Sequence, residues 1–279
     1  MANVATNMRA LYQRPLKSLD HLGRELSFFI RAILWAPRTI RRYKKEILRL
    51  LAEVTLGSGA LAVIGGTVGV ITALAFFTGT EVGLQGYAAL NQIGTAAFAG
   101  FVSAYFNTRE ISPLVAGIAL AATVGCGFTA QLGAMRISEE VDALEVMAIP
   151  SLPFLVTTRI IAGLIAIVPL YVVGLLSSYF ATRLTVTQFF GQSAGTYDHY
   201  FNQFLPPGDV LWSFGKVLIF AVVVILIHCY HGYNASGGPA GVGIAVGHAV
   251  RTSIVAINVI DLFLSMAIWG TTTTVRLAG

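Results

Sequence analysis

The acidic side chains of this 279-residue sequence gather in one short stretch, Arg136–Pro150, which reads RISEEVDALEVMAIP. Four of the thirteen acidic residues fall within seven positions there, and long apolar runs flank the stretch on both sides. A short acidic helix with an apolar stripe is suited to docking on another protein. The alternative is an ordinary solvated loop helix. Position and charge density favour docking.

The spacing within this stretch predicts one helix over residues 138–149. Ser138 is a suitable N-cap, the acids that follow it favour the positive helix end, and Pro150 ends the helix. Val141, Leu144 and Ala148 recur at helical spacing and form an apolar stripe. A helix of this length cannot cross a bilayer, so we expect it to lie outside the membrane and to offer the stripe to a partner.

The composition predicts a polytopic membrane protein rather than a soluble enzyme. Hydrophobic residues make up 56% of the chain and charged residues 11%, with a mean hydropathy of +0.75. A soluble domain carries about 25% charged residues. The expected fold is an all-α membrane domain over residues 54–279, preceded by a basic amphipathic interfacial region over residues 1–53.

The charge of the chain is concentrated near its N-terminus. Residues 1–50 hold eleven of the eighteen lysines and arginines and three acids, a net charge of +8. This imbalance predicts a cytoplasmic N-terminus near anionic lipid. The basic residues are not interleaved with aromatic residues as in nucleic-acid-binding proteins, so no nucleic acid is expected as a partner.

Two amphipathic helices are expected in this region instead of a cleaved signal peptide. Leu22, Leu26, Phe29 and Ile33 share one helical face, and Trp35 and Pro37 interrupt it. The second helix sets apolar residues against cations: Ile40, Ile47, Leu50 and Leu51 against Arg41, Arg42, Lys44, Lys45 and Arg49. The alternative is a cytosolic helix packed on a partner.

Several apolar segments are long enough to span a membrane. The predicted spans are Val54–Thr80, Ile111–Met135, Ile160–Thr182, Val217–Tyr230 with its flanks, and Thr252–Thr274. In the first of them, Gly65 and Gly69 form a GxxxG pair that would let another helix approach closely. Val82–Thr108 is uncharged but more polar, and Leu184–Leu211 lacks lysine and arginine.

The number of crossings follows from the position of the acidic helix. If that helix meets a cytoplasmic partner, an even number of crossings separates it from the N-terminus. Val82–Thr108 is therefore expected to be a re-entrant or broken segment. The prediction is five crossings, with Thr108, Gly195 and the C-terminus on the outer side.

A few isolated polar residues have two interpretations each. His228 and His231, three residues apart, permit a metal site, although interfacial hydrogen bonding is favoured because no carboxylate is near them in sequence. Asp261 lies inside the last predicted span, where an ionisable group favours a functional or interhelical role over a helix-end position. Cys126 and Cys229 are interpreted as packing residues rather than a disulfide, and the hydroxyls of Thr271–Thr274 as bonded to the backbone. Asp198 and His199 either contact a partner on the outer side or lie in a solvated loop.

Six short motifs carry a resemblance to a known family. They are GLQGY at Gly83–Tyr87, RE-x-x-P at Arg109–Pro113, Gly125–Met135, EEVDALEVMAIP, TTRIIAG at Thr157–Gly163 and HGYNA at His231–Ala235. In order and spacing they resemble the MlaE/YrbE permease family. The basic N-terminus is most similar to the YrbE subunits of Mce lipid-import systems.

That resemblance implies an ABCG-like permease fold in a bacterial inner membrane. It implies two permease subunits, a cytoplasmic ATPase dimer that binds ATP and Mg, extracytoplasmic MCE proteins, and membrane lipids as cargo. It also implies that the acidic stretch is a coupling helix. The matching docking positions are Ser138, Glu139, Glu140, Val141, Asp142, Leu144, Glu145 and Met147.

The chain departs from the family at two positions. Members usually carry an Arg and a Glu in an AGRxGSxxxAExG pattern, where this chain has Thr123 and Gln131. A buried ion pair is costly unless both partners are present, so their joint loss is physically coherent. It suggests a heterodimer whose other permease retains both charges.

The chain has no sequence pattern for ATP hydrolysis. A phosphate-binding loop needs GxxxxGK[ST] after a strand, and none of the four lysines (Lys17, Lys44, Lys45 and Lys216) stands in that setting. The sequence also contains no HExxH and no GxSxG. We therefore expect a non-catalytic subunit that binds no cofactor itself. The alternatives are a stand-alone channel or an intramembrane enzyme.

Overall fold

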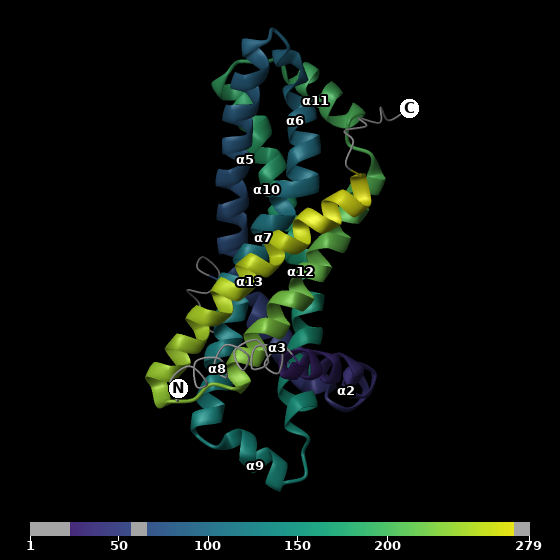
Figure 1. Cartoon of the computed structure of the whole chain (residues 1–279). Helices are drawn as coiled ribbons and strands as arrows, with labels where there is room; N and C mark the ends of the chain where they lie inside the picture. Colours follow the sequence, from purple (N-terminus) through teal and green to yellow (C-terminus); the bar gives the residue numbers. More distant parts are fainter. Residues whose placement is uncertain (1–22, 57–65, 271–279) are drawn as a thin grey trace, which may run out of the picture.

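The computed structural model describes residues 23–56 and 66–270, and every regular element in these ranges is helical. Five helices are long and apolar enough to cross a membrane: Thr67–Gln92, Ala96–Ile137, Pro153–Phe189, Pro207–Tyr233 and Gly238–Trp269. They form an elongated bundle (Figure 1). The prediction of an all-α membrane protein with five crossing helices is confirmed.

The N-terminal helices lie beside one end of the bundle (Figure 1). Residues 23–34 are helical, followed by α2 (Ala36–Arg42) and α3 (Lys44–Leu56). Pro37 occupies the first turn of α2, where its missing N–H costs no hydrogen bond. Ile47 and Leu50 of α3 are buried, whereas Leu26 and Leu34 are more than half exposed, as expected for helices lying at a lipid interface.

The first two crossing helices form a hairpin whose boundaries differ from the prediction. α5 (Thr67–Gln92) begins inside the predicted first span and continues through Glu81, and the chain then turns at residues 93–95. The second helix is a continuous series of segments: η1 (Ala96–Phe98), α6 (Ala99–Val102), η2 (Ser103–Ile111), α7 (Ser112–Leu120), η3 (Ala121–Gly125) and α8 (Cys126–Ile137). The segment Val82–Thr108 is thus not a separate re-entrant segment: it consists of the end of α5, the 93–95 turn and the start of the second crossing helix.

Two charged sites taken as span boundaries lie inside these helices. Glu81 is in the middle of α5, and Arg109 and Glu110 belong to η2. Thr108, expected on the outer side, is fully buried in η2. A charged side chain is costly inside a membrane helix but does not end it, and Arg109 and Glu110 both have charged partners, as described below.

The second half of the chain contains α10 (Thr158–Leu184), which packs on α3, α5 and α12. It comprises α9 (Glu140–Val146), η4 (Pro153–Thr157), η5 (Thr185–Phe189), α11 (Ala194–Gln203), α12 (Pro207–Tyr233) and α13 (Gly238–Trp269). Pro207 starts α12, and Gly237 precedes α13 with φ at +88°, a conformation that glycine adopts without strain. The last span therefore begins at Gly238 rather than at Thr252, and it runs diagonally across the bundle (Figure 1).

Glycines permit a close approach between α5 and α10. A Cβ added at Gly79 would collide with the backbone of Ser178, and one added at Gly83 would come within 2.9 Å of Thr185 Cβ. Gly79 and Gly83 are four residues apart and form the GxxxG pair of this interface. Of the predicted pair, Gly69 lies partly buried in the first turn of α5, and Gly65 lies outside the described residues, as does the run Thr271–Thr274.

The two ends of the bundle carry different elements. α9 lies at one end, and the 93–95 turn and α11 lie at the other (Figure 1). Two crossing helices separate α3 from α9, so the basic helices and the acidic helix share one side of the membrane. This agrees with the parity on which the five-crossing prediction rests.

Candidate functional site

The acidic helix α9 is shorter than predicted and begins differently. α8 continues to Ile137, and the Ser138 hydroxyl donates to the Ala134 carbonyl at 3.0 Å, so Ser138 closes α8 instead of capping α9. Glu139 precedes α9 with φ at +61°, a left-handed conformation that reverses the chain. The N-cap prediction for Ser138 is wrong because the preceding helix satisfies that hydroxyl first.

The apolar stripe of α9 faces the protein itself. Val141 is fully buried, and Leu144 is partly buried against the same core. The face left to a partner, here called the docking face, consists of exposed residues: Glu139, Glu140, Asp142, Glu145, Val146 and Met147. Val146 is 88% exposed and Met147 60% exposed, so two apolar side chains stand among four carboxylates. Expecting Val141 to contact a partner was wrong, since this fully buried side chain anchors α9 to its own bundle. Leu144 is partly buried, and its contact with a partner stays a prediction.

Polar contacts attach α9 to three other helices. Arg136 at the end of α8 pairs with Asp142 at 2.6 Å. The Ser151 hydroxyl lies 2.6 Å from Glu145 Oε1 and 2.7 Å from the Tyr233 hydroxyl at the end of α12. Since Ser151 lies just before η4 and α10, these contacts connect α9 with α8, with α12 and with the start of the η4–α10 helix.

A cluster of charges is buried where η2, α12 and α13 meet. Lys216 is fully buried, and its Nζ lies 2.6 Å from Asp261 Oδ1 and 3.3 Å from Glu110 Oε2. The Ser265 hydroxyl donates to Glu110 Oε1 at 2.8 Å. Asp261 thus has the interhelical role considered for it, because it holds α13 on α12 through Lys216.

A second ion pair adjoins this cluster. Arg109 donates to Asp209 at 2.7 Å, and the Trp269 indole N–H donates to the same carboxylate at 2.9 Å. The Arg109 guanidinium also lies over the ring of Tyr105, 4.1 Å from its centroid. These contacts give charges inside spanning helices the partners that a low-dielectric environment requires.

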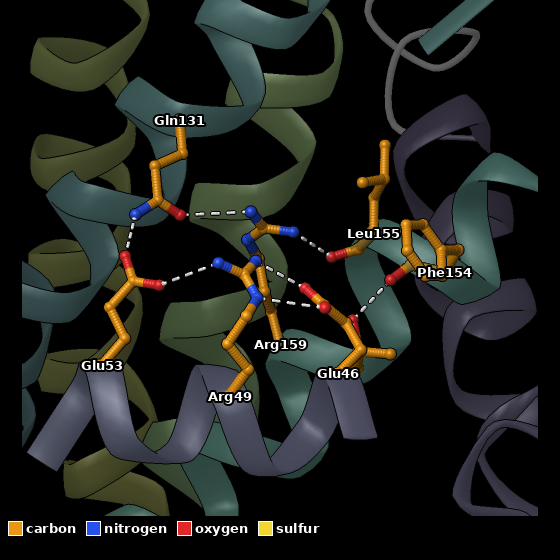
Figure 2. A network of polar contacts seen from close by, with 8 residues as sticks. Glu46, Arg49, Glu53, Gln131, Phe154, Leu155 and Arg159 are labelled. Atoms are coloured by element: carbon orange, nitrogen blue, oxygen red, sulfur yellow. Dashed lines mark hydrogen bonds and ion pairs between the residues drawn. The ribbon is translucent and has the colours of Figure 1, made fainter. Parts of the chain in front are cut away.

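Of the two positions that depart from the family pattern, Gln131 belongs to a chain of polar contacts with Arg159 and with α3 (Figure 2). Arg159 is 4% exposed and donates to Gln131 Oε1 at 3.1 Å and to the Leu155 carbonyl at 2.7 Å. Gln131 Nε2 donates in turn to Glu53 on α3. Gln131 therefore connects a buried cation with a carboxylate of the interfacial helix. The hydroxyl of Thr123 bonds only its own helix, at the Ala119 carbonyl.

Arg49 extends this chain on α3. Its guanidinium donates to Glu46 at 2.6 Å and lies 3.8 Å from Glu53 (Figure 2). The hydrogen bond to Glu46 raises the pKa of Arg49. Two carboxylates and one cation of α3 thus lie beside Gln131 and Arg159.

The histidines do not form a metal site among the described residues. His228 is buried, with Nδ1 2.9 Å from the Thr129 hydroxyl and Nε2 3.2 Å from the Ser253 hydroxyl. His228 thus joins α8, α12 and α13. The ring of His231 stacks on that of His248, with centroids 6.3 Å apart. Cys126 and Cys229 are both free thiols, as predicted.

An apolar groove of about 610 Å³ opens on the hairpin near the end opposite α9. Its walls come from α5 and from α6 and η2, and they include Leu90, Phe101 and Phe106. Such a volume and lining suit an acyl chain or a similar apolar body. We call it the α5–η2 groove.

Sequence reasoning missed three residues that the structure brings to these sites: Glu81, Arg159 and Lys216. Each is a single charge within or beside an apolar run, which is the available signal for an intramembrane polar contact. On the α11 side, Asp198 pairs with Arg183 at 2.8 Å, and His199 packs on Tyr200.

Known proteins similar to this chain identify its family. A family model described as "Permease MlaE" matches residues 57–267. The chain belongs to the MlaE permease family. This family was the one predicted from the six motifs, and the matched range contains α9, four of the five crossing helices and all but the last two residues of the fifth.

Several relatives of this MlaE family permease are named proteins. A probable ABC transporter permease protein of Rickettsia bellii is 30% identical over 70% of this chain and 76% of its own length. The intermembrane phospholipid transport system permease protein MlaE of Haemophilus influenzae is 26% identical over 94% and 97%. TRIGALACTOSYLDIACYLGLYCEROL 1 of Arabidopsis thaliana, a chloroplastic protein, is 30% identical over 71% and 57%.

Proposed function

We propose that this chain is the permease subunit of an ATP-driven lipid transporter in a bacterial inner membrane. The names of its relatives, which include a phospholipid transport permease, support the cargo class. The observation that carries the proposal is the docking face of α9, which exposes apolar and acidic side chains outside a membrane bundle.

In this proposal a cytoplasmic ABC ATPase binds the docking face. Val146 and Met147 would insert into an apolar depression of the ATPase, and the four carboxylates would pair with basic residues around it. ATP and Mg are bound by that partner. The permease contributes no catalytic residue.

Motion of the ATPase pair reaches the membrane helices through the contacts of α9. The Arg136–Asp142 pair pulls on α8, and Ser151 pulls on α10 and α12. The α5–η2 groove lies at the other end of the same long helix as α8. Tilting of that helix would widen or narrow the groove, and lipid would pass to or from extracytoplasmic MCE proteins there.

A second permease subunit is also part of the proposal, and a paralogue fits better than an identical copy. Arg159 lacks a carboxylate at position 131 and relies on an amide, so a partner that retains the usual charges would complement this chain. Native mass spectrometry that finds two copies of this chain and no paralogue would reject the heterodimer. The stand-alone channel and the intramembrane enzyme gain no support from any cluster described above.

Co-purification of an ATPase with the tagged full chain from its own host tests the function. We expect a protein with a GxxxxGK[ST] motif to bind wild type and to be lost with Val146→Asp plus Met147→Asp. Asp198→Lys changes an exposed acid at the opposite end and serves as the matched control. Leu144 is not substituted in this test, because its side chain packs on the core of the permease itself. Retention of the ATPase by the double variant would refute docking at α9.

A further inference from the structure

Glu81 is the one charged residue of the 26-residue helix α5. Spanning the hydrocarbon core takes about 20 residues, and every 20-residue stretch of α5 contains Glu81. Glu81 follows the start of α5 by roughly 21 Å and precedes its end by roughly 16 Å, at 1.5 Å per residue. The carboxylate therefore lies within the apolar layer of the membrane.

This carboxylate lines the α5–η2 groove and is exposed there. Among the described residues no lysine, arginine or histidine forms an ion pair with it. An ionisable side chain at this depth is costly unless it contacts protein, water or ligand polar groups. The contrast with Asp261, which is paired with a buried lysine, shows that the described part of the chain supplies no cation to Glu81 and leaves its carboxylate open to a ligand in the groove.

The polar groups around Glu81 present acceptors to the groove. Gln85, one helical turn later, uses its amide N–H to donate to Glu81 Oε1, which leaves the Gln85 carbonyl oxygen as an acceptor. The Thr78 hydroxyl donates to the Leu74 carbonyl of its own helix at 2.8 Å. The other groove walls are apolar, from Val82 to Phe106. The groove thus combines an apolar body with a short run of hydrogen-bond acceptors.

We propose that Glu81, supported by Gln85, selects lipids whose polar head donates hydrogen bonds, through a primary ammonium or a hydroxyl group. A phosphate or carboxylate without such a donor would be repelled by the carboxylate. A quaternary ammonium would gain charge attraction but no hydrogen bond. This proposal rests on the proposed lipid-transport function and names the substrate class that the groove accepts.

Native mass spectrometry of the full chain, purified with its bound partners and mixed with equimolar lipids, tests the selection. The probes are dioleoyl phosphatidylethanolamine, phosphatidylcholine and phosphatidic acid, and separately cholesterol with its methyl ether. We expect phosphatidylethanolamine to be retained over phosphatidylcholine, and cholesterol over its ether, each by about tenfold, as a hydrogen bond to a charged group allows.

Variants then assign the preference to Glu81. Glu81→Leu should abolish both preferences, whereas Glu81→Gln, which keeps the shape and an acceptor oxygen, should lose the ammonium preference and keep most of the hydroxyl preference. The two sources of donor are thereby distinguished. Thr72→Val is the matched control on the same helix, because Thr72 does not line the groove and its hydroxyl donates to the Val68 carbonyl, and it should leave both preferences unchanged.

Unchanged ratios in Glu81→Leu would overturn the inference. A second result would also overturn the inference: Glu81→Lys dissociates the two permease subunits but leaves the ratios of bound lipids unchanged. Glu81 would then contact a protein partner instead of a lipid. Ala89→Trp, which fills the groove, distinguishes two outcomes: that Glu81 does not select the lipid, and that the proposed lipid-transport function is wrong. If it reduces all lipid binding while Glu81 variants change no ratio, the groove still carries lipid. If it reduces none, the lipid route itself is wrong.

Discussion

Lys216 Nζ lies 2.6 Å from Asp261 Oδ1 in the interior of the bundle, with the Glu110 carboxylate 3.3 Å away on its other side. One buried cation therefore holds two carboxylates from two different helices. The Arg109 carbonyl also accepts from Lys216, at 2.6 Å. Through this contact α13, which packs lightly on the bundle, is fixed to α12 and η2.

Removing the shared cation should cost more than removing either anion. Lys216→Met leaves two carboxylates facing each other, and we expect it to lower the free energy of unfolding by about 3–5 kcal/mol. Asp261→Asn should cost less, because Lys216 keeps Glu110. The double variant Lys216→Met plus Asp261→Leu should recover part of the loss. Thermal unfolding midpoints of the full chain in detergent measure this order, and an equal effect of both single changes would contradict it.

An amide and a carboxylate at positions 131 and 53 should be tolerated in exchanged positions only when both residues are substituted. Gln131→Glu alone gives Arg159 a carboxylate but places two carboxylates side by side, since Gln131 now donates to Glu53. We expect this single change to destabilise the protein. Adding Glu53→Gln restores a donor between the two positions and should restore stability. A double-mutant cycle of unfolding midpoints with no coupling between positions 53 and 131 would disprove that Gln131 links Arg159 to Glu53.

Gly79 should tolerate no side chain. Gly79→Ala places a Cβ against the Ser178 backbone of α10, which cannot move aside as a side chain can, so α5 and α10 must separate. We expect a lowered unfolding midpoint. Gly215→Ala on α12 is the control, because a Cβ there meets nothing within 4 Å. That change should be neutral or stabilising by up to about 1 kcal/mol. Similar midpoints for the two variants would show that α5 and α10 are not in such close contact.

The Arg183–Asp198 pair should contribute little, and only above acidic pH. The hydrogen bond from Arg183 holds the pKa of Asp198 below its usual value. The pair therefore stabilises the folded state above the unfolded pKa of about 4 and loses this effect as the pH falls further. Because both side chains are nearly half exposed, we expect Asp198→Asn to cost less than about 1 kcal/mol at pH 7 and nothing at pH 3. Unfolding midpoints at the two pH values measure the difference.

Cysteine labelling should place α9 and α11 on opposite sides of the membrane. In a Cys126→Ala, Cys229→Ala background, a membrane-impermeant thiol reagent added to cells should label Ile93→Cys and Gly195→Cys. Asp142→Cys should react only after the cells are permeabilised. Ile93 is labelled rather than Thr108, which was also expected on the outer side, because Ile93 is 72% exposed and Thr108 is fully buried. Labelling of Asp142→Cys in intact cells would invert the topology and exclude a cytoplasmic ATPase at α9.

The sequence alone determined the class, the number of crossings, the family and the place of the acidic helix. These features depend on local composition: apolar runs must lie in lipid, and an acidic stretch between them must lie outside it. The place of the acidic helix followed from its carboxylates, from Pro150 and from the apolar runs on both sides. The family resemblance depended on motif order, which is also read along the chain.

Only the tertiary structure decided where the charges inside the bundle lie and which face of α9 is free. Glu81 and Arg109 looked like span boundaries, because the sequence does not show that Asp209, a hundred positions from Arg109, supplies its counter-ion. Val141 looked like a docking residue, because helical spacing gives the stripe but not the side on which the bundle lies. The partner of a charge and the orientation of a face are set by contacts between distant segments, which only folding brings together.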